Sequence, residues 1–165
     1  VGDRPLPPDN AAAEKLNRRL HSLAIPVVSG AFHAAGIQDL HDRTVRLQDN
    51  PLYISQVKFV FDDAGGVFHF EKNGQWHRLT FGYGKHIRQP FAEYGDDAIA
   101  SGAWANDDTL NICCLLPGNR NAAIRITARV RSNAVTIGMS AAAEGMLEDY
   151  DGHASGYFGD AAPFG

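Results

Sequence analysis

The sequence is poor in cysteine and has no disulfide pattern. Its 165 residues include two cysteines, Cys113 and Cys114, which are adjacent. Neighbouring residues on a strand point to opposite faces, so these two thiols would not bond to each other without distortion. A disulfide framework and a CxxC metal or redox motif are therefore excluded, while the redox compartment stays open.

The sequence also lacks long apolar runs and a strong positive charge. No run approaches the ~20 apolar residues of a membrane-spanning helix, so we predict no membrane span. The first residues, VGDRPLPPDN, have no apolar core and predict no signal peptide. They begin with Val rather than Met, so we expect a processed product or a cloned piece of a longer protein. A formal net charge of −4 argues against nucleic acid as the main partner.

Length and composition indicate one soluble globular domain. Hydrophobic residues make up 44% and charged residues 21% of the chain, as in ordinary folded proteins. Residues 1–8 contain three prolines and are predicted to be a linker. A single domain should follow over residues 9–165, beginning with a helix over 10–24, whose Leu16 and Leu20 fall on one stripe.

Most of the remaining chain alternates between apolar and polar residues. The clearest example is AAIRITARV, in which isoleucines alternate with arginines and a threonine. Such alternation predicts strands with one dry and one wet face. We count about eight short strands over roughly 43–147, and no clear element in the tail 148–165. The predicted fold class is mainly β: an antiparallel barrel of about eight strands preceded by one N-terminal α-helix.

Two short motifs suggest catalysis or metal binding, and the expected strand geometry supports neither. Ser55 and Lys58 match the SxxK pattern of serine enzymes, but three positions apart on a strand they face opposite ways. His69, His77 and Glu71 could bind a metal if strand pairing joined them. Alternation turns His69 toward solvent, so we predict no metal site, no cofactor and no catalytic residue in this chain.

Aromatic and basic residues supply the remaining candidates. Six rings between residues 59 and 81 are predicted to face the interior, either as core or as the lining of a cavity for a small apolar ligand. A basic stripe and one indole are candidates for an interface with a partner surface. The possible cavity-lining residues are Phe59, Phe61, Phe68, Phe70, Trp76 and Phe81, and the possible interface residues are Trp104, Arg125, Arg129 and Arg131.

Five stretches together resemble a known family. They are NAAAEKLNRRLHSLAIP, HDRTVRLQDNPLYISQVKFVF, QWHRLTFGYGKH, ASGAWANDDTLNICCLL and AIRITARVRSNAVTIGM. The pattern of turns and rings is similar to the C-terminal β-rich domain of bacterial beta-lactamase-related serine hydrolases, of the class C or penicillin-binding-protein-like type. The resemblance covers most of the chain and includes no catalytic signature.

The resemblance implies a lipocalin-like barrel that packs beside a catalytic serine-hydrolase domain of the same polypeptide. On this hypothesis the chain is a non-catalytic accessory domain that shapes the active site, and a periplasmic or secreted location is favoured. Two alternatives stay open. One is a stand-alone barrel that binds a small apolar ligand. The other is an autonomous enzyme built on His69, His77 and Glu71.

Overall fold

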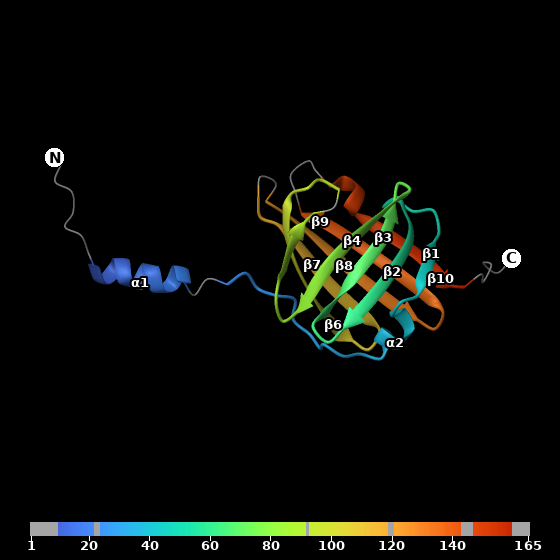
Figure 1. The fold of residues 1–165 in the computed structure, drawn as a ribbon, viewed down its shortest axis with the longest axis horizontal. Coiled ribbons are helices and arrows are strands. Elements are labelled where there is room, and N and C mark those ends of the chain that lie inside the picture. Colours follow the sequence, from blue (N-terminus) through green and yellow to red (C-terminus); the bar gives the residue numbers. More distant parts are fainter. Residues whose placement is uncertain (1–9, 22–23, 92, 119–120, 143–146, 160–165) are drawn as a thin grey trace.

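One sheet that closes on itself dominates the molecule (Figure 1). The computed structural model describes residues 10–21, 24–91, 93–118, 121–142 and 147–159. The helices are α1 (Asn10–His21), α2 (Gly36–Leu40) and the short 3₁₀ helix η1 (Glu148–Tyr150). The strands are β1 (Thr44–Leu47), β2 (Ile54–Asp62), β3 (Gly65–Lys72), β4 (Gln75–Tyr83), β5 (Ile87–Pro90), β6 (Asp97–Asn106), β7 (Thr109–Leu116), β8 (Ala122–Arg131), β9 (Ala134–Ala142) and β10 (Gly152–Phe158).

Nine of these strands form a closed ring. Their order is β4-β3-β2-β1-β10-β9-β8-β7-β6, and β6 pairs back to β4, while β5 adds to β6. Every pairing is antiparallel except the parallel contact between β4 and β6. The predicted antiparallel barrel is thus confirmed, with nine strands in the ring instead of about eight.

The strands form where apolar and polar residues alternate. Along β8, Ile124 and Ile126 are buried while Arg125 and Arg129 are exposed. Tight turns connect the strands, and the turn between β3 and β4 places Asn73 and Gly74 at φ 51° and 76°. This left-handed pair is typical of a two-residue hairpin turn whose twist matches the flanking strands.

The strand β10 completes the ring between β1 and β9. It lies in the tail 148–165, where the sequence predicted no element, and residues 160–165 of that tail lie outside the described residues. Its inner face carries the small residues Ala154 and Gly156 and ends in the buried Phe158. A Cβ at Gly156 would lie 2.0 Å from the carbonyl oxygen of Arg46, so β1 and β10 pair closely only because this residue is glycine.

The N-terminal segment runs to one end of the barrel. Helix α1 stands apart from the barrel in Figure 1, and its described side chains are exposed, Leu16 included. It covers less than the predicted 10–24; residues 22 and 23 lie outside the described residues. Further on, Ala31 exchanges two backbone hydrogen bonds with Trp104, both 2.8 Å long. No helix in the described part of the chain is long and apolar enough to cross a membrane.

Candidate functional site

Five of the six predicted interior rings lie inside the barrel. Phe59 and Phe68 stack with their ring centroids 4.7 Å apart, and Phe68 and Phe70 follow at 5.1 Å. Phe61 contacts Phe81 edge-on at 6.4 Å. The five expose at most 8% of their surface. A water-sized cavity would expose the side chains that line it, so these rings fill the space around them.

Trp76 lies outside the barrel instead. It exposes 51% of its surface near the β3–β4 turn, where it pairs with Glu71. The reason is parity: residues five apart on a strand face opposite sides, so Trp76 and Phe81 cannot both point inward. The inward residue beside this position is His77, whose ring lies 5.3 Å from that of Phe70.

Trp104, a predicted interface residue, is part of the core. It exposes 1% of its surface, packs 5.7 Å from the Phe61 ring and donates an indole N–H hydrogen bond to the Tyr83 hydroxyl at 3.2 Å. Burial raises the pKa of Tyr83, so the hydroxyl stays protonated. Trp104 is therefore unavailable to a partner surface, since strand β6 turns it inward.

The buried Lys72 lies at the end of the barrel that the 3₁₀ helix η1 covers. The Lys72 side chain is fully buried and forms an ion pair with Asp149 of η1, with Nζ 3.1 Å from Oδ2. Its ammonium also donates to the carbonyl oxygen of Leu52 at 2.6 Å and lies 4.8 Å from the centre of the Tyr150 ring. Sequence reasoning missed Lys72, although alternation with Phe68 and Phe70 places it on the inner face.

Tyr150, which lies beside Lys72, is also fixed by its contacts. Its hydroxyl donates a hydrogen bond to the Glu93 carboxylate, and its ring packs 5.7 Å from the Phe91 ring. Burial, with Glu93 next, raises the pKa of Tyr150. The polar groups at this end thus satisfy one another and leave an interior lined by apolar side chains.

The histidines and the serine that the sequence suggested as possible sites do not come together. His69 is on the outer face between Lys58 and Arg78, whereas His77 faces inward, so the two do not converge. In the described part of the chain no three His, Cys, Asp or Glu side chains gather in a metal-binding group. Ser55 donates a hydrogen bond to Glu71 at 2.7 Å. Its SxxK partner Lys58 pairs with Asp42 at 2.6 Å.

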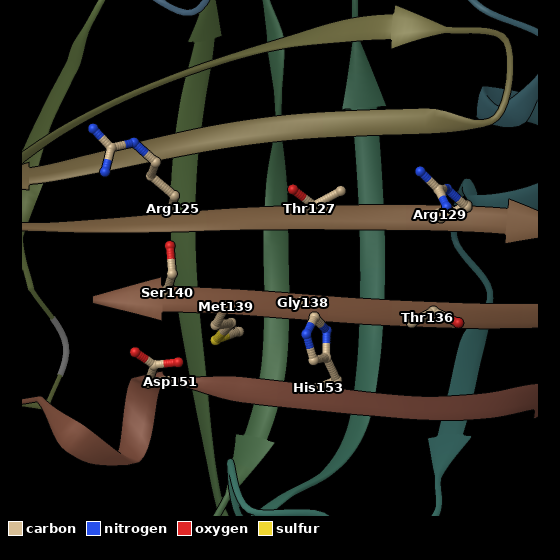
Figure 2. Close-up of a pocket in the computed structure, with 9 residues that line it drawn as sticks. All are labelled: Arg125, Thr127, Arg129, Thr136, Gly138, Met139, Ser140, Asp151 and His153. Carbon is tan, nitrogen blue, oxygen red and sulfur yellow. The ribbon is translucent and has the colours of Figure 1, made fainter. Parts of the chain in front are cut away.

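The three predicted interface arginines lie on the outer face of β8, and two of them, Arg125 and Arg129, line a hollow in the surface (Figure 2). Arg131 pairs with Asp108 at 3.4 Å, and the Arg129 Nε–H donates to Thr109. A groove of about 500 Å³ lies over β8, β9 and β10. Its lining residues are Arg125, Thr127, Arg129, Thr136, Gly138, Met139, Ser140, Asp151 and His153. The sequence pointed to the two arginines but missed the residues of β10, because it predicted no strand there.

The fold is shared with barrels that bind fatty acids. A Schistosoma mansoni fatty acid binding protein in complex with arachidonic acid matches with a TM-score of 0.54 and 10% identity, covering 74% of this chain and 97% of that chain. A fatty-acid-binding protein from Drosophila melanogaster brain matches with a TM-score of 0.51 and 8% identity, covering 73% and 99%. No family model matches, and neither does any curated protein. At this identity the likeness shows the lipocalin-like fold alone.

These matches overturn the resemblance to beta-lactamase-related serine hydrolases. The two similar structures are barrels that form nearly the whole of their own chains, and nothing in the comparisons points to a hydrolase domain. The turns and rings that suggested the family are features of small antiparallel barrels in general. The catalytic partner domain and the exported location that rested on that resemblance have no support.

Proposed function

We propose that this chain is a non-catalytic barrel that binds a small, uncharged apolar molecule in its interior. The observation that carries the proposal is the closed ring of nine strands around phenylalanine and aliphatic side chains. Burial of apolar surface would supply the binding energy. The shared fold with two fatty-acid-binding proteins supports an interior ligand, one of those structures being a complex with arachidonic acid.

The charge of the interior favours a neutral ligand over a fatty acid. Among the described residues, Lys72 is the one charged side chain in the buried set. Asp149 already pairs with it, and the carbonyl oxygen of Leu52 accepts another of its hydrogen bonds. A ligand carboxylate inside the barrel would therefore be desolvated without a free cation to pair with, at a cost of several kcal/mol.

The packing sets the size of the ligand. The phenylalanines fill the space around them, so a ligand must displace rings such as Phe68 and Phe59. Rearranging a close-packed interior is costly, which limits the ligand to a small molecule and makes binding depend on ring movement.

Fluorescence of a single indole tests the proposal. The chain has two tryptophans, so W76F leaves Trp104 in the core as the reporter. We would titrate W76F with 1-dodecanol and with laurate, which have the same chain length but differ in charge. The expected result is a saturable change in Trp104 emission with tighter binding of the alcohol.

Two further variants sharpen the test. In the W76F background, Phe68→Leu removes an interior ring, and Tyr157→Leu removes an outer ring that is 36% exposed. Phe68→Leu should change the affinity for dodecanol, whereas Tyr157→Leu should leave it unchanged. If neither dodecanol nor a neutral apolar dye such as N-phenyl-1-naphthylamine binds to any of these proteins, the barrel is a filled core and the proposal fails.

A further inference from the structure

A groove on the outer face of β8, β9 and β10 lies apart from the barrel interior (Figure 2). Its floor is open because Gly138 has no side chain at the centre of the face. In register, Gly138 lies between Thr127 of β8 and His153 of β10. A Cβ at Gly138 would lie 3.0 Å from the His153 Nδ1 atom, so the imidazole ring packs over the glycine and forms one wall.

The two ends of the groove differ in charge pairing. Figure 2 shows Arg129 and Thr136 at one end and Arg125, Ser140 and Asp151 at the other. Arg129 is engaged by Thr109 and lies close enough to Asp108 to lower the pKa of that carboxyl, after the larger effects of Thr109 and Arg131. Arg125 has no hydrogen bond or ion pair to any described residue. The Arg125 guanidinium is therefore available to bind a ligand in the groove.

We propose that this groove binds a small organic anion that carries its own hydroxyl group. A guanidinium binds carboxylate and phosphate groups with paired hydrogen bonds, which fits a carboxylate or a phosphate ester at Arg125. The Asp151 carboxylate accepts no hydrogen bond from the described side chains and lies at the same end, where it would repel a bare anion. Strand β9 separates Arg125 from Asp151, and the guanidinium is directed away from the carboxylate in Figure 2. When the exposed Arg125 side chain turns over β9 to hold the anionic group, a ligand hydroxyl next to that group would donate to Asp151.

The groove supplies polar groups for the rest of such a ligand. The Ser140 hydroxyl and the exposed His153 ring both line it. The Thr127 hydroxyl is already used, because it donates to Asn111 at 3.0 Å. The site is open to solvent, so binding should weaken as salt screens the guanidinium.

The test compares probes that share one skeleton. We would follow the backbone amide signals of Thr127, Gly138 and His153 by NMR while adding glycerol 3-phosphate, D-glycerate, glycerol or inorganic phosphate. The expected order is binding by the first two, weaker binding by inorganic phosphate and none by glycerol. Preference for the phosphate ester or for the carboxylate distinguishes the two anion classes. Equal binding of glycerol overturns the proposal.

Matched variants locate the anion. R125M removes the charge but keeps the length of the side chain, and it should lower the affinity for the anionic probe roughly tenfold or more, as for a charged hydrogen bond. R46M is the control, because Arg46 is exposed on the outer face of β1 and does not line this groove. Unchanged binding in R125M, or an equal loss in R46M, overturns the assignment.

Two more variants test the hydroxyl requirement and the shape. D151N should raise the affinity for inorganic phosphate and bring it closer to the affinity for glycerol 3-phosphate. If the ratio of these two affinities is the same as in the parent protein, Asp151 does not have the proposed role. G138A should weaken binding severalfold, because the new methyl group displaces the His153 ring and fills the floor. R125M should leave dodecanol binding in the interior unchanged, so this site and the proposed function can fail independently.

Discussion

At the scale of single residues, the buried Lys72 is the least expected feature of the barrel. A lysine is almost never fully buried unless it is paired, and this one is held by Asp149 and by the carbonyl oxygen of Leu52. Its alkyl stem lies within the barrel end and its ammonium ties strand β3 to the helix η1. The pair therefore connects residues 77 positions apart in the sequence.

Replacing Lys72 by methionine should lower the free energy of unfolding by about 2 kcal/mol. The substitution keeps the volume but leaves Asp149 without its cation; a fully buried partner would cost more, but Asp149 is 32% exposed. Lys58→Met is the control, since Lys58 pairs with Asp42 on the surface and should show no measurable change. Urea unfolding of both variants measures the difference. Equal midpoints for the two would contradict the structure.

His69 predicts a pH dependence of stability. Burial, and then the nearby Lys58 and Arg78, hold the pKa of His69 below its ordinary value of 6.5. The unfolded chain therefore binds a proton at higher pH than the folded barrel does. This contribution to stability is present above pH 6.5 and is lost as the pH falls through the lower pKa of the folded state.

An NMR titration of the His69 ring measures that pKa directly, and H69Q should flatten the fall in stability between neutral and mildly acid pH. A His69 pKa above 6.5 would show that neither burial nor the two cations lowers the pKa of this ring.

At the scale of elements, the pairing of β1 with β10 depends on one glycine. Gly156→Ala would place a methyl group 2.0 Å from the carbonyl oxygen of Arg46 and force the strands apart. We expect a loss of about 2 kcal/mol or more in the free energy of unfolding, as for overpacking in a rigid interior. Gly118→Ala is the control, because apart from its chain neighbours no described atom lies within 4 Å of its Cβ position. Thermal unfolding of both variants checks the prediction; similar melting temperatures would contradict the close pairing.

At the scale of the whole molecule, the ring closes at a short seam. Strands β4 and β6 pair over two residue pairs, Gly82 with Ser101 and Tyr83 with Gly102. Beyond them the side-chain amide of Gln89 on β5 accepts from the Thr80 N–H at 2.9 Å and donates to the Thr80 carbonyl oxygen at 2.5 Å. The Gln89 side chain thus supplies the hydrogen bonds to β4 beyond the point where the pairing of β4 with β6 ends.

Gln89→Ala should open this seam. The Thr80 backbone would lose both partners, so we expect faster hydrogen exchange at its amide and a loss of about 1–2 kcal/mol in stability. Gln75→Ala, at an exposed position in the same strand as Thr80, should change neither. Hydrogen exchange followed by NMR makes the measurement, and an unaltered rate at Thr80 in Gln89→Ala would rule out the side-chain bridge.

The sequence alone determined the properties that depend on residues close together in the chain, namely the strands and the face on which each residue lies. Alternation along a strand is local, so it predicted the barrel class, the outward Arg125, Arg129 and Arg131, and the inward Phe68 and Phe70. The same rule, applied across a full strand, would also have placed Trp76 outside and Lys72 inside. Short runs of turns and rings did not specify a family, because many small barrels share them.

Only the tertiary structure decided which distant segments lie together. Strand β10 has only one large residue, Phe158, beside alanine and glycine on its inner face, and it forms because β1 and β9 supply its partners. The ion pair of Lys72 with Asp149 and the groove that joins Arg125 to Asp151 follow from that closure. Local periodicity encodes the face on which a residue lies. Its partners are selected by packing and hydrogen bonding between strands far apart in the chain, and these interactions exist only once the ring is closed.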